Sequence, residues 1–405
     1  MSIRQIEAYE PLTLLSVVSF VKEKGLIPKE SRVHCEEIGD GNLNLVFRLV
    51  DQSTNQTLIV KQALPYAKVV GESWPLTLDR ARIESEALQE AEKLVPNLVP
   101  KVYDIDYTFA ATVLEDLSDH VILRKGLIEG KQYPHLANDI GTYLAYTLFS
   151  TSDAALSPQE KKKRVVQFTN PELCQITEDL VFTDPFFKSE TNNYPQELQP
   201  EVSELWEDSA LKLEVAKLKQ KFLTNAEALL HGDLHTGSVF VKEDSTKVID
   251  PEFAFYGPRG FDIGAFFANI ILNYIAQEKR IADLGKREEF QAYLLEVIEE
   301  TWQVFKNTFT ALWQESAVEK FADVEGYVNY VLAVTFEDTI GFAGCKVIRR
   351  TIGLAHVEDL DGIANLDAQL EAKRAALKTG RSLILNRQNI TNVKELVELV
   401  RSANS

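Results

Sequence analysis

The chain has 405 residues, of which 45% are hydrophobic, and its 61 acidic and 43 basic side chains give a formal net charge of −18. This length and apolar content suit either two or three domains with full cores or one two-lobed enzyme. Because the net charge is strongly negative, we expect neither nucleic acid nor an anionic membrane surface as a partner.

The cysteines and the apolar segments indicate the compartment. Cys35, Cys174 and Cys345 are odd in number and far apart, which is typical of a reducing compartment without a disulfide framework. The first residues include two glutamates and lack the long apolar run of a signal peptide. The most apolar run, 263–276, is too short to cross a bilayer and indicates a buried helix. We therefore expect a soluble cytoplasmic protein.

The N-terminal part predicts a helix followed by a β-hairpin. Apolar positions recur at helical spacing over 12–24 and stop at Gly25. Two β runs then flank a turn rich in glycine and asparagine, 39–44. Glycines at a hairpin tip let backbone N–H groups approach a phosphate without obstruction by Cβ atoms. The tip therefore predicts a phosphate contact, and a plain hairpin with a polar tip is the alternative.

A single lysine, Lys61, stands within the apolar strand predicted over 57–63. A lysine inside a sheet core is costly unless it is paired, and a nucleotide phosphate together with a carboxylate would satisfy it. A lysine at the sheet edge that reaches solvent is the alternative. The carboxylate should come from the helix predicted over 78–94. Glu84 and Glu86 lie roughly 200° apart around that helix, so only one can face the lysine, and we favour Glu84.

A connector and two strands complete the N-terminal part. The connector, 66–76, contains glycine and a Trp-Pro pair, and is either a structured link or a lid over a site. Strands are predicted over 102–106 and 110–115, and the second runs into a short polar link. We place the lobe boundary at this link, with an N-terminal nucleotide-binding lobe, 1–115, and a C-terminal catalytic and substrate-binding lobe, 116–405.

Beyond residue 131 the pattern becomes mostly helical. The stretch 152–163 is predicted to be a polar loop, and the basic run 161–164 a solvated helix face. Strands followed by helices indicate an α+β fold with two unequal lobes, a small β-rich N-terminal lobe and a large, mainly helical C-terminal lobe. The predicted helices are 136–150, 173–181, 198–223, one that ends near 277, 287–316, and two or three more toward the C-terminus.

The most informative stretch is 229–240, followed by 247–252. An apolar lead-in is followed by a polar loop with Asp233, a short β run, a turn, and a second β run that ends on Asp250 and Glu252. Carboxylates held on rigid elements can orient a hydroxyl and hold a divalent cation, as phosphoryl transfer from ATP requires. Asp233 would accept a hydrogen bond from the substrate hydroxyl and then its proton. Asp250 and Glu252 would share one face of the strand and hold Mg²⁺.

Three other side chains near this loop are candidates for bracing it. His231 and His235 could in principle bind zinc, but the glycine between them argues against a helical H-x-x-x-H site. We expect both histidines to form hydrogen bonds within the loop instead. Asp262 is predicted to brace the same loop and not to touch substrate.

Several segments together resemble one family. The loop 231–238 reads H-G-D-L-H-T-G-S and is similar to the catalytic loop of the protein-kinase-like fold, in its aminoglycoside- and choline-kinase branch. That loop and the segments 250–258, 39–44 and 68–76 resemble the bacterial 5-methylthioribose kinases, and the similarity covers essentially the whole chain. The resemblance implies Mg²⁺- and ATP-dependent phosphorylation of methylthioribose at its 1-hydroxyl, in methionine salvage, by a homodimer.

The resemblance also implies roles for individual residues. Arg349 and Arg350, on an apolar helix predicted over 341–356, would lie at the substrate. Guanidinium groups can donate to sugar hydroxyls and stabilise charge on the transferring phosphoryl group, and arginines paired with surface acids are the alternative. Asp233 is implied to contact substrate. The residues implied to bind the nucleotide or its metal are Asn44, Lys61, Glu115, Asp116, Leu117, Asp250, Pro251 and Glu252.

Two other functions stay open at this point. The chain could phosphorylate another small hydroxyl substrate, such as choline, homoserine or an aminoglycoside. It could also be a nucleotide-binding scaffold without catalysis, because Ser238 stands where the wider fold has a metal-binding asparagine, which leaves the number of metal ions open. The presence of Asp233, Asp250 and Lys61 argues against a scaffold.

Overall fold

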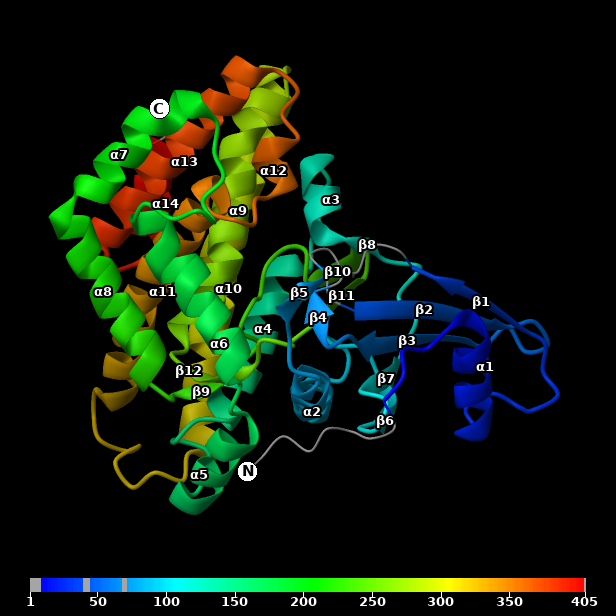
Figure 1. The fold of residues 1–405 in the computed structure, drawn as a ribbon. Helices are drawn as coiled ribbons and strands as arrows, with labels where there is room; N and C mark the ends of the chain where they lie inside the picture. Colours follow the sequence, from blue (N-terminus) through cyan, green and yellow to red (C-terminus); the bar gives the residue numbers. More distant parts are fainter. Residues whose placement is uncertain (1–8, 39–43, 68–70, 404–405) are drawn as a thin grey trace. The chain divides into compact units, whose positions relative to one another are not determined.

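The computed structural model describes residues 9–38, 44–67 and 71–403, which fall into two compact units. The first unit comprises Met1–His120 and Lys247–Phe253, and the second comprises Val121–Thr246 and Ala254–Ser405. Figure 1 shows a sheet as the main element of the first unit and helices as the main elements of the second. The predicted α+β class, with a small β-rich part followed by a larger helical part, is confirmed.

The first unit is built on an antiparallel sheet with the strand order β1-β2-β3-β7-β6. Helix α1 (Leu14–Glu23) begins with a capping box between Thr13 and Ser16, and its apolar face packs into the core of the sheet. The helix predicted over 12–24 and the strand predicted over 57–63 are confirmed. The other elements are β1 (Val33–Glu37), β2 (Asn44–Asp51), β3 (Thr57–Ala63), β4 (Tyr66–Ala67), β5 (Gly71–Pro75), α2 (Asp79–Leu94), β6 (Val102–Asp106) and β7 (Ala111–Leu114).

The centre of the second unit is helical. Helix α11 packs against α9 and α13, and α10 packs against α4. Short strands carry the loops: β9 pairs with β12, and β10 lies between β8 and β11. The helices are α3 (Leu123–Ile128), α4 (Leu136–Ser150), α5 (Pro158–Gln167), α6 (Pro171–Thr177), α7 (Gln199–Glu207), α8 (Ser209–Thr224), α9 (Gly260–Arg280), α10 (Leu284–Ser316), α11 (Tyr327–Ile352), α12 (Glu358–Asp361), α13 (Leu366–Asn386) and α14 (Val393–Ala403). The strands are β8 (Val121–Ile122), β9 (Ala228–Leu230), β10 (Val239–Lys242), β11 (Ser245–Val248), which runs across the boundary between the units, and β12 (Phe255–Gly257).

Glycine lets α9 and α11 approach each other closely. A Cβ atom on Gly264 would lie 2.6 Å from the carbonyl oxygen of Thr339, a backbone atom that cannot move aside alone. We therefore expect Gly264→Ala to lower the free energy of unfolding by about 1–3 kcal/mol, as overpacking does. Gly285→Ala on α10 is the matched control, because its Cβ would meet nothing closer than 3.6 Å. Chemical denaturation of both variants measures the difference, and equal stabilities would contradict the close approach.

Two predicted helices differ from the structure. The helix predicted over 173–181 is α6, which continues into a π-helical stretch, Glu178–Thr183. The helix predicted over 198–223 is broken into α7 and α8 at Asp208. Asp208 has extended backbone angles, and its carboxylate accepts a hydrogen bond from the backbone N–H of Leu211, so it ends one helix and caps the next.

The predicted polar loop 152–163 and the solvated basic run are wrong in part. Ser157 caps α5 and Pro158 occupies its first turn, so the chain is helical from 158. Lys161 is 1% exposed, and its ammonium group donates to the carbonyl of Glu227 at 2.7 Å and lies over the ring of Tyr256. A lysine can be buried when its charge is paired in this way, which the run of basic residues alone does not reveal.

Membrane insertion receives no support from the helices. Across 9–38, 44–67 and 71–403, none of them combines the length and the apolar character that a membrane span requires.

Candidate active site

The loop between β9 and β10 in the second unit is braced from α9. The carboxylate of Asp262 accepts hydrogen bonds from the backbone N–H groups of His231 at 2.6 Å and Gly232 at 3.0 Å. Gly232 has a φ of +85°, a left-handed conformation that glycine adopts without strain. His231 Nδ1 accepts from the backbone N–H of Asp233 at 3.3 Å. Asp262 and His231 therefore have the bracing contacts that the sequence predicted.

Asp233 is surrounded by donors from the same unit. Its Oδ1 lies 2.9 Å from Lys346 Nζ, and its Oδ2 lies 3.3 Å from His235 Nε2 and 3.6 Å from Arg350 Nη2. Burial by itself raises the pKa of Asp233, but Lys346, His235 and Arg350 more than offset this and hold the pKa well below its usual range. Asp233 is therefore ionised at neutral pH and is a weak base.

His235 is a neutral donor in this arrangement. Its Nδ1 accepts from the backbone N–H of Gly237 at 2.9 Å, so the ring proton lies on Nε2 and faces Asp233. Burial lowers the pKa of His235 to about 4, and Arg350 and Arg124 act in the same direction against Asp233. Among the described residues, the cluster of side chains able to share a metal ion contains neither histidine of the loop. The zinc alternative therefore has no support.

Arg349 and Arg350 are buried on α11, at 9% and 7% exposed. Burial lowers the pKa of both guanidinium groups, opposed by Asp233. Within the described part of the chain, Nε and Nη1 of Arg349 and Nε of Arg350 have no hydrogen-bond partner. Buried donors without partners suit a ligand that carries oxygens, which favours the substrate role over surface ion pairs.

Sequence reasoning missed two cations of this site, Lys346 and Arg124. Arg124 on α3 donates to Asn269 at 3.0 Å and lies 3.3 Å from the carboxylate of Asp359. Lys346, Arg349 and Arg350 follow the spacing i, i+3 and i+4, so they share one helix face, and this spacing could have revealed Lys346. Lys346, Arg124, Arg349 and Arg350 thus outnumber the carboxylates of Asp233, Asp359 and Asp262, and the excess of positive charge suits an anion such as a phosphoryl group.

Ser238 lies at the end of the loop between β9 and β10 and contacts other residues of that loop. Its hydroxyl is directed at the carbonyl oxygen of Asp233, at 3.3 Å, and lies 3.4 Å from His235 Nδ1. The side chain is 3% exposed. These contacts give Ser238 a bracing part within the loop.

The first unit contains the other group of predicted residues. Lys61 on β3 pairs with Glu84 of α2 at 2.7 Å and with Asp250, whereas Glu86 pairs with Arg82 at 2.9 Å. Glu84 is therefore the partner, and this agrees with the preference stated from the sequence. Because β3 lies between β2 and β7, the alternative of an edge lysine is wrong.

Asp250 and Glu252 do not lie on a strand. Strand β11 ends at Val248, and Asp250 has a φ of +69°, so the argument that both share one strand face is wrong. The tertiary structure nevertheless brings the carboxylates together: ligand oxygens of Glu84, Asp250 and Glu252 all lie within 4.8 Å of one another. Pro251, between the last two, is buried.

Arg80 is a further buried cation that sequence reasoning missed. It is 0% exposed at the start of α2, and its Nη1 donates to Glu252 and to Asn44, both at 2.6 Å. Asn44 also donates to Glu252 at 3.4 Å. An arginine within a predicted helix is usually a surface residue, so this pairing had no local signal.

The carboxylate cluster fits a divalent cation. Three carboxylates face two cations, Lys61 and Arg80, and carboxylate oxygens are the ligands that Mg²⁺ prefers. Burial raises the pKa of Glu84, and the charges of Asp250 and Glu252 add to this against the opposing effect of Lys61. A bound dication would relieve this excess of negative charge.

The predicted adenine link keeps its side chains within the first unit. The carboxylate of Asp116 accepts from Arg48 Nε at 2.8 Å, and that of Glu115 accepts from the backbone N–H of Lys101 at 3.1 Å. Leu117 is buried. If this link contacts adenine, its backbone groups would therefore make the contact. The adenine contact stays a prediction.

Parts of two predicted motifs lie outside the described residues. These are the glycine-rich tip at 39–43 and the segment 68–70 of the predicted lid. The phosphate contact of the tip and the lid motion stay predictions.

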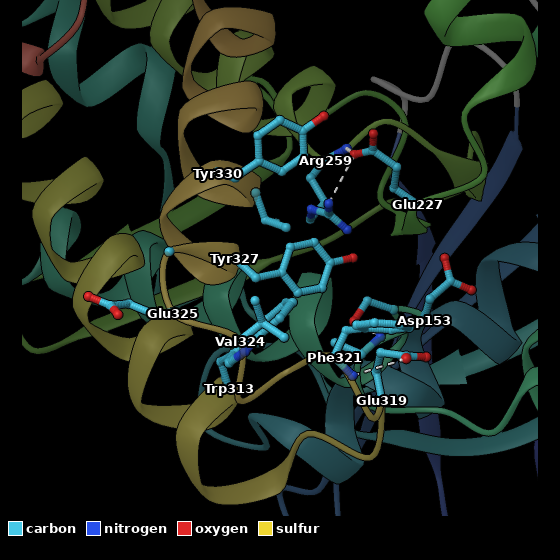
Figure 2. Close-up of a pocket in the computed structure, with 14 residues that line it drawn as sticks. Asp153, Glu227, Arg259, Trp313, Glu319, Phe321, Val324, Glu325, Tyr327 and Tyr330 are labelled. Carbon is cyan, nitrogen blue, oxygen red and sulfur yellow. Dashed lines mark hydrogen bonds and ion pairs between the residues drawn. The ribbon is translucent and has the colours of Figure 1, made fainter.

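A separate pocket of about 730 Å³ lies in the second unit beside the segment that joins α10 to α11. Figure 2 shows Tyr327 and Tyr330 beside Arg259, which lies 3.5 Å from the carboxylate of Glu227. Asp153 on the same pocket lies 3.4 Å from Lys161 Nζ. These charges are already matched, and the predicted substrate and nucleotide residues do not line this pocket. It is not the candidate active site.

Comparison with known proteins identifies the family. The model of the phosphotransferase enzyme family matches residues 34–314. A methylthioribose kinase of Geobacillus sp. (strain WCH70) is 58% identical, with 96% of each chain covered, and one of Geobacillus kaustophilus is 56% identical, with 98% of each covered. A solved ethanolamine kinase of Plasmodium vivax is 15% identical, with a TM-score of 0.48 over 93% of this chain and 90% of that one. The chain therefore belongs to the methylthioribose kinases, within the phosphotransferase enzyme family.

Proposed function

We propose that this enzyme transfers the γ-phosphoryl group of ATP to the 1-hydroxyl of methylthioribose, in methionine salvage. The hydroxyl oxygen forms a bond to the γ-phosphorus, the bond from that phosphorus to the β–γ bridging oxygen breaks, and ADP leaves. The observation that carries the proposal is the partly exposed Asp233 carboxylate, which lies among Lys346, Arg350 and His235 in a chain at least 56% identical to two methylthioribose kinases.

The low pKa of Asp233 indicates how the carboxylate acts. A carboxylate held ionised by three donors is a strong hydrogen-bond acceptor but a poor base. It would therefore orient the sugar hydroxyl first and receive its proton late, once bonding to phosphorus is advanced. Arg349 and Arg350 would donate to the sugar or to the transferring phosphoryl group.

The nucleotide would be held by residues of the first unit. Lys61 and Asn44 would contact its phosphates, and the backbone of 115–117 would contact adenine. Asp250 and Glu252 would hold Mg²⁺, which neutralises charge on the phosphates when it is bound. The remaining expectations belong to the same proposal: a cytoplasmic homodimer in which 1–115 binds nucleotide and 116–405 carries catalysis.

Kinases of other small alcohols are the second candidate. The excess of buried cations around Asp233 disfavours a cationic substrate such as choline, because like charges repel strongly where water is excluded. A scaffold without catalysis is disfavoured because Lys61, Glu84, Asp250 and Asp233 are all held in charged arrangements.

The test is ATP-dependent phosphorylation of methylthioribose, ribose, choline, homoserine and kanamycin, each with Mg²⁺ and with EDTA. We expect turnover of methylthioribose with Mg²⁺ and loss of this turnover with EDTA. Turnover of another substrate instead would refute the substrate, and activity that persists in EDTA would refute the metal site. ATP binding without any turnover would support the scaffold.

A further inference from the structure

Lys346 occupies a place that packing alone does not explain. The ammonium-bearing side chain is 2% exposed, lies over the ring of Phe261, and has its Nζ 2.9 Å from Asp233 Oδ1. Burying a lysine in a helical core is costly unless its charge is paired with an opposite charge or hydrogen-bonded. The partner is the carboxylate proposed to receive the substrate proton, 113 residues away in the chain.

The two carboxylate oxygens of Asp233 have contacts of different number and length. Oδ1 forms the short contact with Lys346, whereas Oδ2 has two longer contacts, 3.3 Å to His235 and 3.6 Å to Arg350. Both contacts of Oδ2 are longer than an ordinary N–H···O hydrogen bond, so a new donor at Oδ2 would displace only weak interactions, whereas Oδ1 is held by a hydrogen bond of normal length. Oδ2 is therefore the oxygen that can receive a sugar hydroxyl.

We propose that Lys346 is a positioning residue, which pairs with Oδ1 of Asp233 and fixes the carboxylate so that Oδ2 accepts the substrate hydroxyl. This inference rests on the proposed function. Lys346 would act through Asp233 and would not itself touch the reacting atoms.

The charges around Lys346 agree with a cation at neutral pH. Burial lowers its pKa to about 8, Arg349 and Arg350 act in the same direction, and Asp233 opposes them. From α9, Asp262 faces the same cluster, and from the loop His235 does so as a neutral ring. With its pKa near 8, Lys346 is mainly protonated at pH 7.

The experiment compares Lys346→Met with Lys346→Arg in methylthioribose phosphorylation. We expect Lys346→Met to lower kcat by about 10²-fold, with the KM for ATP unchanged, because the acceptor is no longer held. Without the cation the neutral form of Asp233 is favoured, so its pKa rises. The acid limb of the pH profile of Lys346→Met should then lie at higher pH than that of the wild type. Lys346→Arg, which keeps the charge, should restore the acid limb of the wild-type pH profile.

A matched control separates this role from general damage. Lys221→Met also removes a lysine paired with a buried carboxylate of the second unit, but that carboxylate is Asp338 and not Asp233. We expect it to keep the wild-type kcat and pH profile. If Lys346→Met does not fold, the test rests on Lys346→Arg. An acid limb of Lys346→Arg at higher pH than that of the wild type would overturn the proposal, because this variant keeps the positive charge.

The possible failures are distinguishable. A wild-type enzyme that does not phosphorylate methylthioribose would refute the proposed function. An active wild type together with a Lys346→Met variant of unchanged kcat and acid limb would refute only the positioning role.

Discussion

Asp233→Asn should lower kcat by about 10²- to 10⁴-fold while the affinity for ATP stays nearly unchanged. The amide keeps the size of the side chain but can neither receive the hydroxyl proton nor balance the charges of Lys346 and Arg350. The residues proposed to bind the nucleotide belong to the first unit and Asp233 to the second, so the substitution leaves all of those residues unchanged. Steady-state kinetics with ATP and methylthioribose, together with ATP titration by calorimetry, measure both quantities.

Asp244→Asn is the matched control for this prediction. Asp244 is exposed in the turn between β10 and β11, and its substitution changes the net charge by the same amount. It should leave kcat unchanged. Full activity of Asp233→Asn would show that Asp233 is not the proton acceptor.

Arg80→Met should lower the free energy of unfolding by about 3–5 kcal/mol, the cost of leaving one partner of a buried ion pair uncompensated. Arg80 is 0% exposed, Glu252 is 4% exposed, and Arg80 donates to both Glu252 and Asn44. Without the guanidinium group, Glu252 would stay buried beside Glu84 and Asp250 with less positive charge to offset it. Urea denaturation followed by circular dichroism measures the loss.

Arg82→Met is the control on the same helix. Arg82 pairs with Asp79 and Glu86 near the surface, and such pairs contribute about 0–1 kcal/mol. The double variant Arg80→Met, Glu252→Gln should recover part of the stability, because it removes the uncompensated charge. Equal losses for Arg80→Met and Arg82→Met would contradict a buried, uncompensated carboxylate.

The sequence by itself determined the elements and the order of the motifs. Strand and helix periodicities depend on neighbouring residues, so α1, β3 and α2 could be predicted, and the geometry of α2 showed that only one of Glu84 and Glu86 could face Lys61. The loop around Asp233 was recognisable because its spacing is local. The same local reasoning failed at Asp208, where one capping side chain divides a continuous helical pattern.

Only the tertiary structure decided which distant charges meet. Lys346 contacts Asp233 across 113 residues of chain, and Arg80 contacts Glu252 across 172. Lys161, in a basic run that looked solvated, is buried because a carbonyl and an aromatic ring from elsewhere in the chain pair with its charge. A basic side chain looks the same in sequence whether it faces water or a buried carboxylate, since its partner is set by how the helices and strands pack. Packing thus places Lys346 beside Asp233, Arg80 beside the carboxylate cluster and Lys161 in the core, and the sequence alone distinguishes none of them from a surface residue.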